Sequence, residues 1–114
     1  MKVIYISHLP LAKNFYAINL FGVVFSRGKL TETEKRHEYI HTMQQKEMLY
    51  VFFYIWYAVE WLIRLIQYRN LYRAYINILY EKEAYRHQTD ASYPKKRKHY
   101  AWLTSSALPA PGQR

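Results

Sequence analysis

No glycine or proline interrupts the chain between Gly28 and Pro94, and this feature constrains the fold more than any other in the sequence. Glycine and proline are the residues that most often end a helix, so a long stretch without them is typical of helical structure. The stretch opens near Thr31 and Thr33, two alternative helix N-caps, each followed by an acidic residue that suits a helix N-terminus. The sequence therefore predicts that the middle of the chain is mostly helical.

An internal break is expected at Asn70. It separates one long helix over Thr33–Arg69, straight or kinked, from a second helix over Leu71–Gln88. The segment Thr89–Pro94 is rich in turn-forming residues and predicts the turn that ends the second helix.

Two short runs before the helices predict strands. Lys2–Ser7 and Ala17–Phe25 are rich in β-branched and aromatic residues, and Gly22 indicates a bulge or a close backbone approach within the second run. The fold class we expect is mainly α with a short N-terminal β element. We expect residues 1–103 to form a single domain and the small, polar, proline-containing segment Thr104–Arg114 to be a disordered tail.

Length and composition exclude several classes of protein. A chain of 114 residues is too short for a barrel or a doubly wound dinucleotide fold. Hydrophobic residues make up 51 % of the chain, which is too many for a disordered protein. Cysteine is absent, so no disulfide framework and no thiolate metal site can form. Any zinc ion must be held by histidine, glutamate or aspartate.

The chain is strongly basic, with a formal net charge of +9. Such an excess favours an anionic partner such as phospholipid, nucleic acid or an acidic protein, although it also serves solubility alone. No nucleic-acid-binding motif accompanies the basic run Lys95–Lys98, so we expect no specific nucleic-acid partner. The N-terminal apolar run is broken at 7–10, too early for a cleavable signal peptide, and we expect a cytoplasmic location, at the inner membrane or free of it.

The residues His37-Glu38-Tyr39-Ile40-His41 form an H-E-x-x-H motif. On a helix, His37 and His41 lie one turn apart on the same face, so both imidazoles can reach one metal ion. Glu38 lies beside that face, where it can take a proton from water held by the metal. The motif predicts a metal site with Glu38 as its base.

A third ligand must come from elsewhere in the chain. Glu47 follows the motif without the glycine that turns the chain in metzincins, so it points away from the metal. Glu81 and Glu83, in the later helix, remain as candidates. A straight helix to Arg69 would carry the chain about 40 Å from His41, and the return to Glu81 recovers only about 15 Å. If Glu81 is a ligand, the chain must bend well before Arg69.

The sequences H-E-Y-I-H-T-M-Q-Q and Y-E-K-E-A resemble the gluzincin pattern H-E-x-x-H…E-x-x-A, which includes small uncharacterised bacterial families. The resemblance covers about half of the chain. It implies a minimal zincin-like domain, a zinc peptidase acting on peptide or protein substrates, and Glu81 as the third ligand beside His37 and His41. Gluzincins also bind substrate along an edge strand, and Ala17–Phe25 is the candidate. The aspartate that usually follows the small residue is replaced by Tyr85.

The segment Met48–Ile66, nineteen residues long, contains only two charged residues, Glu60 and Arg64. It is long enough to span a membrane, and the two charges can pair with each other at i, i+4. A polar stripe follows the helical period along it, comprising Lys46, Tyr50, Phe53, Tyr57, Glu60, Arg64 and Gln67. A core helix, a homo-oligomer interface and a helix in or on a membrane all fit this pattern. The alternative to an enzyme is therefore a non-catalytic helical interaction or membrane-surface protein.

Overall fold

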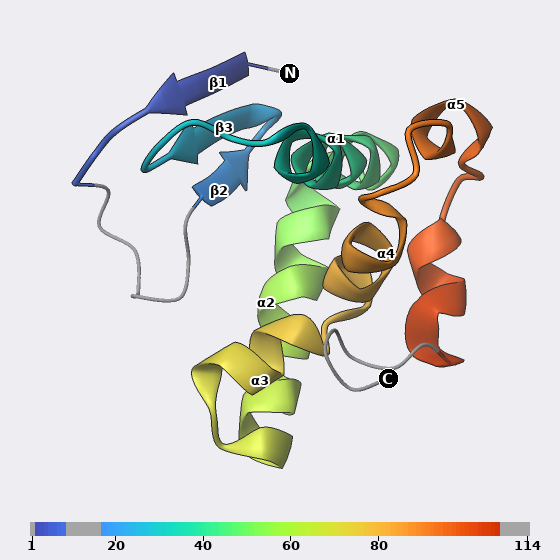
Figure 1. Cartoon of the computed structure of the whole chain (residues 1–114). Coiled ribbons are helices and arrows are strands. Elements are labelled where there is room, and N and C mark those ends of the chain that lie inside the picture. Colours follow the sequence, from blue (N-terminus) through green and yellow to red (C-terminus); the bar gives the residue numbers. More distant parts are fainter. Residues whose placement is uncertain (1, 9–16, 108–114) are drawn as a thin grey trace.

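A three-stranded sheet precedes the helices in the computed structural model, which describes residues 2–8 and 17–107 (Figure 1). The sheet comprises β1 (Lys2–Tyr5), β2 (Ala17–Leu20) and β3 (Val23–Ser26), in the order β1-β3-β2. The central strand β3 pairs in parallel with β1 and antiparallel with β2. The fold is mainly α with a short N-terminal β element, as the sequence predicted.

The predicted single strand over Ala17–Phe25 is in fact a hairpin. Phe21 and Gly22 form a two-residue turn with φ angles of 54° and 84°, so that Leu20 faces Val23 across the pair. Positive φ at both turn residues matches the right-handed twist of the flanking strands. Gly22 thus marks a reversal of the chain, where we expected a bulge or a close backbone approach.

Five helices and one 3₁₀-helix follow the sheet. They are α1 (Glu32–Glu47), α2 (Val51–Tyr68), α3 (Leu71–Ile76), α4 (Leu79–His87), α5 (Tyr93–Lys96) and the 3₁₀-helix η1 (Ala101–Ala107). Thr31 caps α1: its hydroxyl accepts from the Glu34 amide, and the Glu34 carboxylate accepts from the Thr31 amide. This capping box fixes the start of the helix that carries the H-E-x-x-H motif.

The prediction of one long helix over Thr33–Arg69 is wrong, because the chain breaks between α1 and α2 and bends by 113°. Leu49 and Tyr50 have φ angles of 54° and 59°. The Val51 amide donates to the Leu49 carbonyl oxygen at 2.6 Å, which closes a γ-turn with Tyr50 at its centre. The bend before Arg69 that a Glu81 ligand requires is therefore present.

The predicted second helix is also divided. Between α3 and α4 the chain leaves the helical path at Ile78, whose ψ of 136° is extended. Ile78 is fully buried and packs with Phe53, Tyr80 and Trp102 in the larger core cluster. Burial of this side chain accounts for the break, since a continuous helix would place its residues on a different face.

Helix α4 lies between the two clusters of the core. Tyr80 belongs to the larger cluster, while Ala84 packs with Ile40 of α1 and Tyr93 of α5 in the smaller one. In Figure 1, α4 runs beside α2, with α1 and the sheet at one end and η1 on its other side. The core therefore holds α4 against α1, the helix of the motif.

The C-terminal part is more ordered than the sequence predicted. Residues 104–107, expected to begin a disordered tail, belong to η1, and residues 108–114 lie outside the described part of the chain. Trp102 explains the difference, since it is almost fully buried and anchors η1 to the core. Within the basic run, Arg97 is buried and pairs with Glu47 and Glu83.

Candidate metal centre

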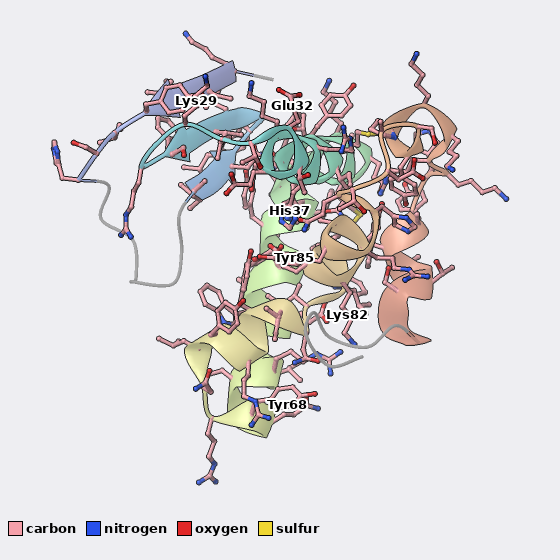
Figure 2. The ribbon with its side chains drawn as sticks, in the orientation of Figure 1. Lys29, Glu32, His37, Tyr68, Lys82 and Tyr85 are labelled. Carbon is pink, nitrogen blue, oxygen red and sulfur yellow. The ribbon has the colours of Figure 1, made fainter. Side chains whose placement is uncertain are left out.

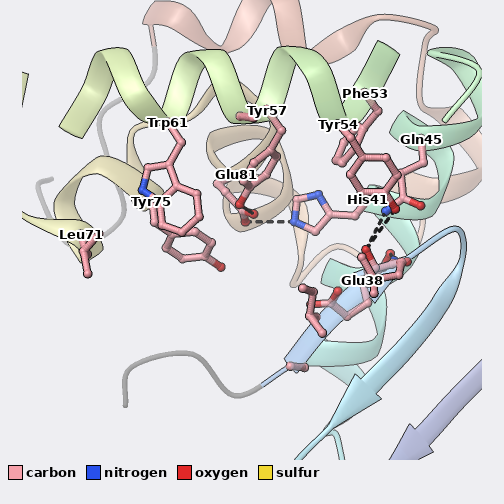
Figure 3. Close-up of a pocket in the computed structure, with 15 residues that line it drawn as sticks. Glu38, His41, Gln45, Phe53, Tyr54, Tyr57, Trp61, Leu71, Tyr75 and Glu81 are labelled. Atoms are coloured by element: carbon pink, nitrogen blue, oxygen red, sulfur yellow. Dashed lines mark hydrogen bonds and ion pairs between the residues drawn. The ribbon is translucent and has the colours of Figure 1, made fainter. Parts of the chain in front are cut away.

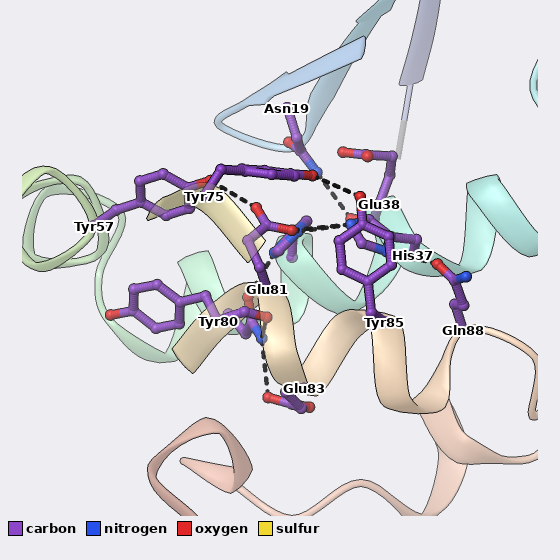
Figure 4. A network of polar contacts seen from close by, with 12 residues as sticks. Asn19, His37, Glu38, Tyr57, Tyr75, Tyr80, Glu81, Glu83, Tyr85 and Gln88 are labelled. Carbon is purple, nitrogen blue, oxygen red and sulfur yellow. Dashed lines mark hydrogen bonds and ion pairs between the residues drawn. The ribbon is translucent and has the colours of Figure 1, made fainter. Parts of the chain in front are cut away.

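The fold brings three metal-ligating side chains from two helices to one point. His37 and His41 lie one turn apart on α1, and Glu81 comes from the first turn of α4. The Oε1 atom of Glu81 lies 3.1 Å from Nε2 of His37 and 2.9 Å from Nε2 of His41. The two Nε2 atoms are 3.1 Å apart, and all three residues are buried (Figure 4).

The outer nitrogen of each imidazole faces an amide oxygen. Nδ1 of His41 lies 2.7 Å from Oε1 of Gln44, and Nδ1 of His37 lies 2.9 Å from Oε1 of Gln88. The amide nitrogen of Gln44 donates to the Tyr80 carbonyl oxygen and to Glu83, which fixes the direction of the amide group. Because an amide oxygen can only accept, each Nδ1 carries a proton, and in the neutral form of each ring Nε2 presents a lone pair.

When both imidazoles are neutral, the Nε2 lone pairs of His37 and His41 and the Oε1 atom of Glu81 face one another, and no proton lies between them. Two Nε2 lone pairs and a carboxylate oxygen repel one another at these distances, so the arrangement needs a cation or an added proton at its centre. Ligands at about 2.0–2.1 Å from a tetrahedral zinc ion lie about 3.3 Å from one another. The observed separations of 2.9–3.1 Å are close to this value. His37, His41 and Glu81 could thus hold a metal ion.

The same contacts shift the pKa values of the ligands in the metal-free protein. Burial would raise the pKa of Glu81, but the charge of His41 and hydrogen bonds from both imidazoles hold that pKa well below its usual range. Burial lowers the pKa of His41, but the charge of Glu81 and the hydrogen bond to it prevail and raise the pKa to about 9. The metal-free site therefore retains a proton on His41 at neutral pH.

Tyrosines surround Glu81 and His37. The Tyr57 hydroxyl of α2 donates to Oε2 of Glu81 at 2.7 Å, which leaves Oε1 directed at the imidazoles. The Tyr85 ring lies against the His37 ring, with centroids 4.3 Å apart (Figure 2). The Tyr85 hydroxyl is 3.0 Å from that of Tyr75 (Figure 4). Burial and the charge of Glu81 raise the pKa of Tyr57 and of Tyr75 well above the usual value, so both hydroxyls stay protonated.

The two alternative carboxylates lie elsewhere. Glu83 accepts hydrogen bonds from Gln44, Tyr93 and Arg97, and Glu47 forms a paired contact with the Arg97 guanidinium. Glu81 is thus the carboxylate that reaches the histidines, in agreement with the resemblance. Glu83 is still linked to the site indirectly. Arg97 and the amide nitrogen of Gln44 both donate to Glu83, and the amide oxygen of Gln44 contacts His41.

A pocket of about 530 Å³ opens beside the three ligands (Figure 3). Glu38, His41 and Glu81 line it, and burial raises the pKa of the Glu38 carboxyl. The rest of its wall is mostly apolar and comes from all four residues of β2, from Gln45 of α1, from α2 and from α3. The fold thus brings Glu38, two of the three candidate metal ligands and an edge strand to one cavity.

Four other histidine and tyrosine side chains, which carry groups able to donate a hydrogen bond to a substrate carbonyl, lie in different surroundings. Tyr75 lines the pocket. Tyr80 is buried in the core, His87 stacks on Tyr93 at 3.8 Å, and His99 is an exposed neighbour of Glu47. Two contacts were missed by sequence reasoning. These are the contacts of Tyr57, which comes from α2, and of Gln88, which follows the last residue of α4. No local sequence pattern points to either residue.

No protein-family model, curated protein or solved structure matches this chain. The assignment of a function to the pocket therefore depends on the chemistry of its own residues.

Proposed function

We propose that the chain is a zinc-dependent metallohydrolase of the gluzincin-like type, acting on peptide bonds. The observation that supports it best is the convergence of His37, His41 and Glu81 at 2.9–3.1 Å, with both outer imidazole nitrogens bound to amide oxygens. Histidine ligands of metal sites usually donate their second N–H in this way, which fixes the ring and its tautomer.

The ligand set favours zinc. Two imidazoles and one carboxylate form an established catalytic zinc set, which leaves a fourth position for water or substrate. Thiolate ligands are absent from the chain, so a closed structural site of the cysteine type is excluded. A zinc ion bound there would supply a Lewis acid that polarises a carbonyl group and makes water more acidic.

Residues of the chain would carry out the proton transfer, hold the Glu81 carboxylate and contact the substrate carbonyl. Glu38, one residue after His37 and lining the same pocket, accepts the proton of the attacking water and passes it to the leaving amine. Its raised pKa suits a group that must both take and release a proton. Tyr57 holds the Glu81 carboxylate in place, and Tyr75 offers a hydroxyl to the carbonyl oxygen of a substrate in the pocket.

The edge strand β2 is the candidate surface for an extended peptide. The Asn19 carbonyl oxygen points away from the sheet and accepts from Gln45 and Tyr54, so it is already in use. Backbone groups alternate along a strand, so those of Ala17 point the same way as those of Asn19. Ala17 lines the pocket, and we propose that a substrate pairs with its backbone.

Metal content tests the proposal. We expect one zinc ion per chain in purified wild-type protein after loading and dialysis, and a large loss in His41→Ala. Elemental analysis for zinc, iron and manganese after loading with each metal distinguishes zinc from the other metals that two histidines and a carboxylate can bind. A wild-type protein that binds none of them tightly would contradict the proposal.

Glu38→Gln tests the role of the base. The variant should keep its zinc but lose hydrolysis of fluorogenic peptides by a factor of about 10² or more, because an amide cannot accept the proton. His99→Gln, which changes an exposed residue outside the pocket, is the control and should cleave at the wild-type rate. If Glu38→Gln cleaves the same peptides as fast as the wild type, Glu38 is not the base.

A further inference from the structure

The outward face of α2 is entirely apolar. Eleven residues of α2 are exposed, and nine of them, all apolar, occupy a continuous arc of about 160° on a helical projection, with Gln67 just beyond one edge. The nine are Val51, Phe52, Ile55, Trp56, Ala58, Val59, Leu62, Ile63 and Ile66. Leu62 and Ile66 are exposed by 62 % and 77 %, so the face is open along most of the helix.

The opposite side of α2 carries the polar groups and faces the protein. Glu60 is buried, pairs with Arg64 as the sequence predicted, and accepts from the amide of Leu79 at the start of α4. Tyr54 and Tyr57 bond to β2 and to Glu81. The helix is therefore inverted relative to a helix on the surface of a water-soluble domain, whose polar side faces solvent. Such a face needs an apolar partner.

The exposed charged residues next to the two ends of α2 are all positive. Lys46 ends α1 just before α2, and Arg69 and Arg73 follow the other end of α2. All three are exposed, and no carboxylate pairs with them in the described part of the chain. The partner of the face should therefore be apolar at its centre and anionic at its edges.

A second copy of the chain does not meet this requirement. Among the described residues, the carboxylates close to α2 are buried and already bonded: Glu60 to Arg64, Glu81 to the two histidines, and Glu47 and Glu83 to Arg97. Two α2 faces packed together would set lysine or arginine against lysine or arginine in either direction. With a formal charge of +9 on each chain, association of two copies is further opposed.

We propose that the outward face of α2 is a docking surface for an anionic phospholipid bilayer. The helix lies in the interface with its apolar arc among the acyl chains, and Lys46, Arg69 and Arg73 contact lipid phosphate. Trp56, which is exposed at the edge of the arc, and Tyr72, which is exposed on α3, suit the boundary between the two layers. In the part of the chain that the structure describes, no single helix is long and apolar enough to cross a membrane; only the bent pair α1 and α2 passes a test of length and composition.

Sedimentation with lipid vesicles tests this inference on the full chain. We expect binding to vesicles of equal parts phosphatidylcholine and phosphatidylglycerol, and weaker binding in high salt or to phosphatidylcholine alone. Chelating any bound metal should leave the binding unchanged, so the result is independent of the proposed enzyme activity. Equal binding to both vesicle types in low and high salt would overturn the anionic part of the proposal.

Paired variants separate the two contributions. Leu62→Gln with Ile66→Gln should weaken binding to the anionic vesicles at least tenfold, because both side chains leave the acyl layer. Tyr5→Gln with Tyr39→Gln, two exposed aromatic residues on other elements, is the matched control and should bind like the wild type. Arg69→Gln with Arg73→Gln should lose about fivefold per residue on anionic vesicles and little on phosphatidylcholine. Retained binding of the Leu62/Ile66 variant would overturn the proposal.

Fluorescence and mass measurements complete the test. Trp56 should be quenched by lipids brominated in their acyl chains, and Trp56→Phe provides the background from Trp61 and Trp102. Sedimentation equilibrium without lipid should give a monomer. A stable dimer that Leu62→Gln with Ile66→Gln dissociates, together with no vesicle binding, would show that a second copy covers the face and would overturn the proposal.

Discussion

At the scale of single residues, Gln44 is the side chain whose amide oxygen and nitrogen are both fixed by buried partners around the site. Its amide oxygen accepts from His41, and its amide nitrogen donates to Glu83, which is itself held by Arg97. The neighbouring Gln45 is equally buried but bonds to the backbone of Asn19 and Gly22. Adjacent glutamines thus serve different purposes, one orienting a metal ligand and the other holding the hairpin.

Gln44→Ala should lower zinc affinity about 10- to 100-fold, because the His41 ring loses the contact that fixes its tautomer. Gln45→Ala should keep the wild-type zinc affinity while reducing stability, since it touches neither imidazole. A competition titration with a chromogenic chelator measures both. Equal losses of affinity in the two variants would mean that Gln44 acts only through the fold.

The proton held between His41 and Glu81 predicts a dependence on pH. A raised pKa of about 9 for His41 stabilises the metal-free protein below the ordinary value of 6.5, and this stabilisation is lost as pH rises through 9. Zinc must displace the same proton, so zinc affinity should rise over that range while metal-free stability falls. Titration calorimetry in two buffers of different ionisation enthalpy should show about one proton released per zinc near neutral pH. No proton release would contradict the assignment of the proton to His41.

The sequence predicted the site residues that share α1 and also Glu81 of α4, but it missed Tyr57 and Gln88, which reach the site from other parts of the chain. His37, Glu38 and His41 follow from the helical period alone, and the short E-x-x-A pattern pointed to Glu81. Gln88 and Tyr57 lie 51 and 24 positions from the residues that they contact, with nothing in the local sequence to select them. The resemblance supplied an aspartate position, and Tyr85 there packs against the His37 ring while the supporting contact comes from Gln88.

At the scale of elements, the turn between α1 and α2 decides whether the site can form. It contains neither glycine nor proline, so the local sequence gave no sign of its place. The distance between His41 and Glu81 along the chain required a bend, but tertiary contacts determine where it falls. The Tyr50 ring packs near Phe21 at the tip of the hairpin, with centroids 5.8 Å apart, and the Tyr54 hydroxyl accepts from the Phe21 amide.

Leu49→Gly tests the strain in this turn. A left-handed backbone costs a branched residue about 1–2 kcal/mol, whereas glycine adopts it freely and loses about 0.5–1 kcal/mol in chain entropy. Leu49 is 70 % exposed, so the variant should be up to about 1 kcal/mol more stable than the wild type. Leu62→Gly, which changes a residue of similar exposure inside α2, should lose about 1 kcal/mol. Urea unfolding of both variants measures the difference, and changes of the same sign would remove the argument for strain.

At the scale of the whole molecule, the three candidate metal ligands join the two halves of the helical region. His37 and His41 belong to α1 and Glu81 to α4, and the α1–α4 contact also includes the core pair Ile40 and Ala84. The fold class could be predicted because it follows from the placement of glycine, proline and β-branched residues. The layout of the helices could not, since it depends on the packing of Tyr80, Trp102 and Ile78.

Zinc should therefore stabilise the fold as a whole. At a free concentration a thousandfold above its dissociation constant, a ligand that binds only the folded state adds about 4 kcal/mol. For a domain of this size, that corresponds to a rise in Tm of about 15–30 °C, reversed by chelation. Scanning calorimetry of the wild type and of His41→Ala, which should show little rise, measures the effect. A wild-type Tm that does not respond to zinc would mean that the ligands do not bind it in the folded protein.

The buried Arg97 has a consequence for the order of events in folding. It contacts Glu47 across 50 positions of the chain, and Glu81 contacts His37 across 44. Contacts between such distant segments carry a high cost in chain entropy and form after local helices. Before they form, His37 and His41 alone offer a metal two ligands of the three. If the three residues bind a metal as proposed, the metal would therefore bind at the last step of folding and would not act as the nucleus around which the chain folds.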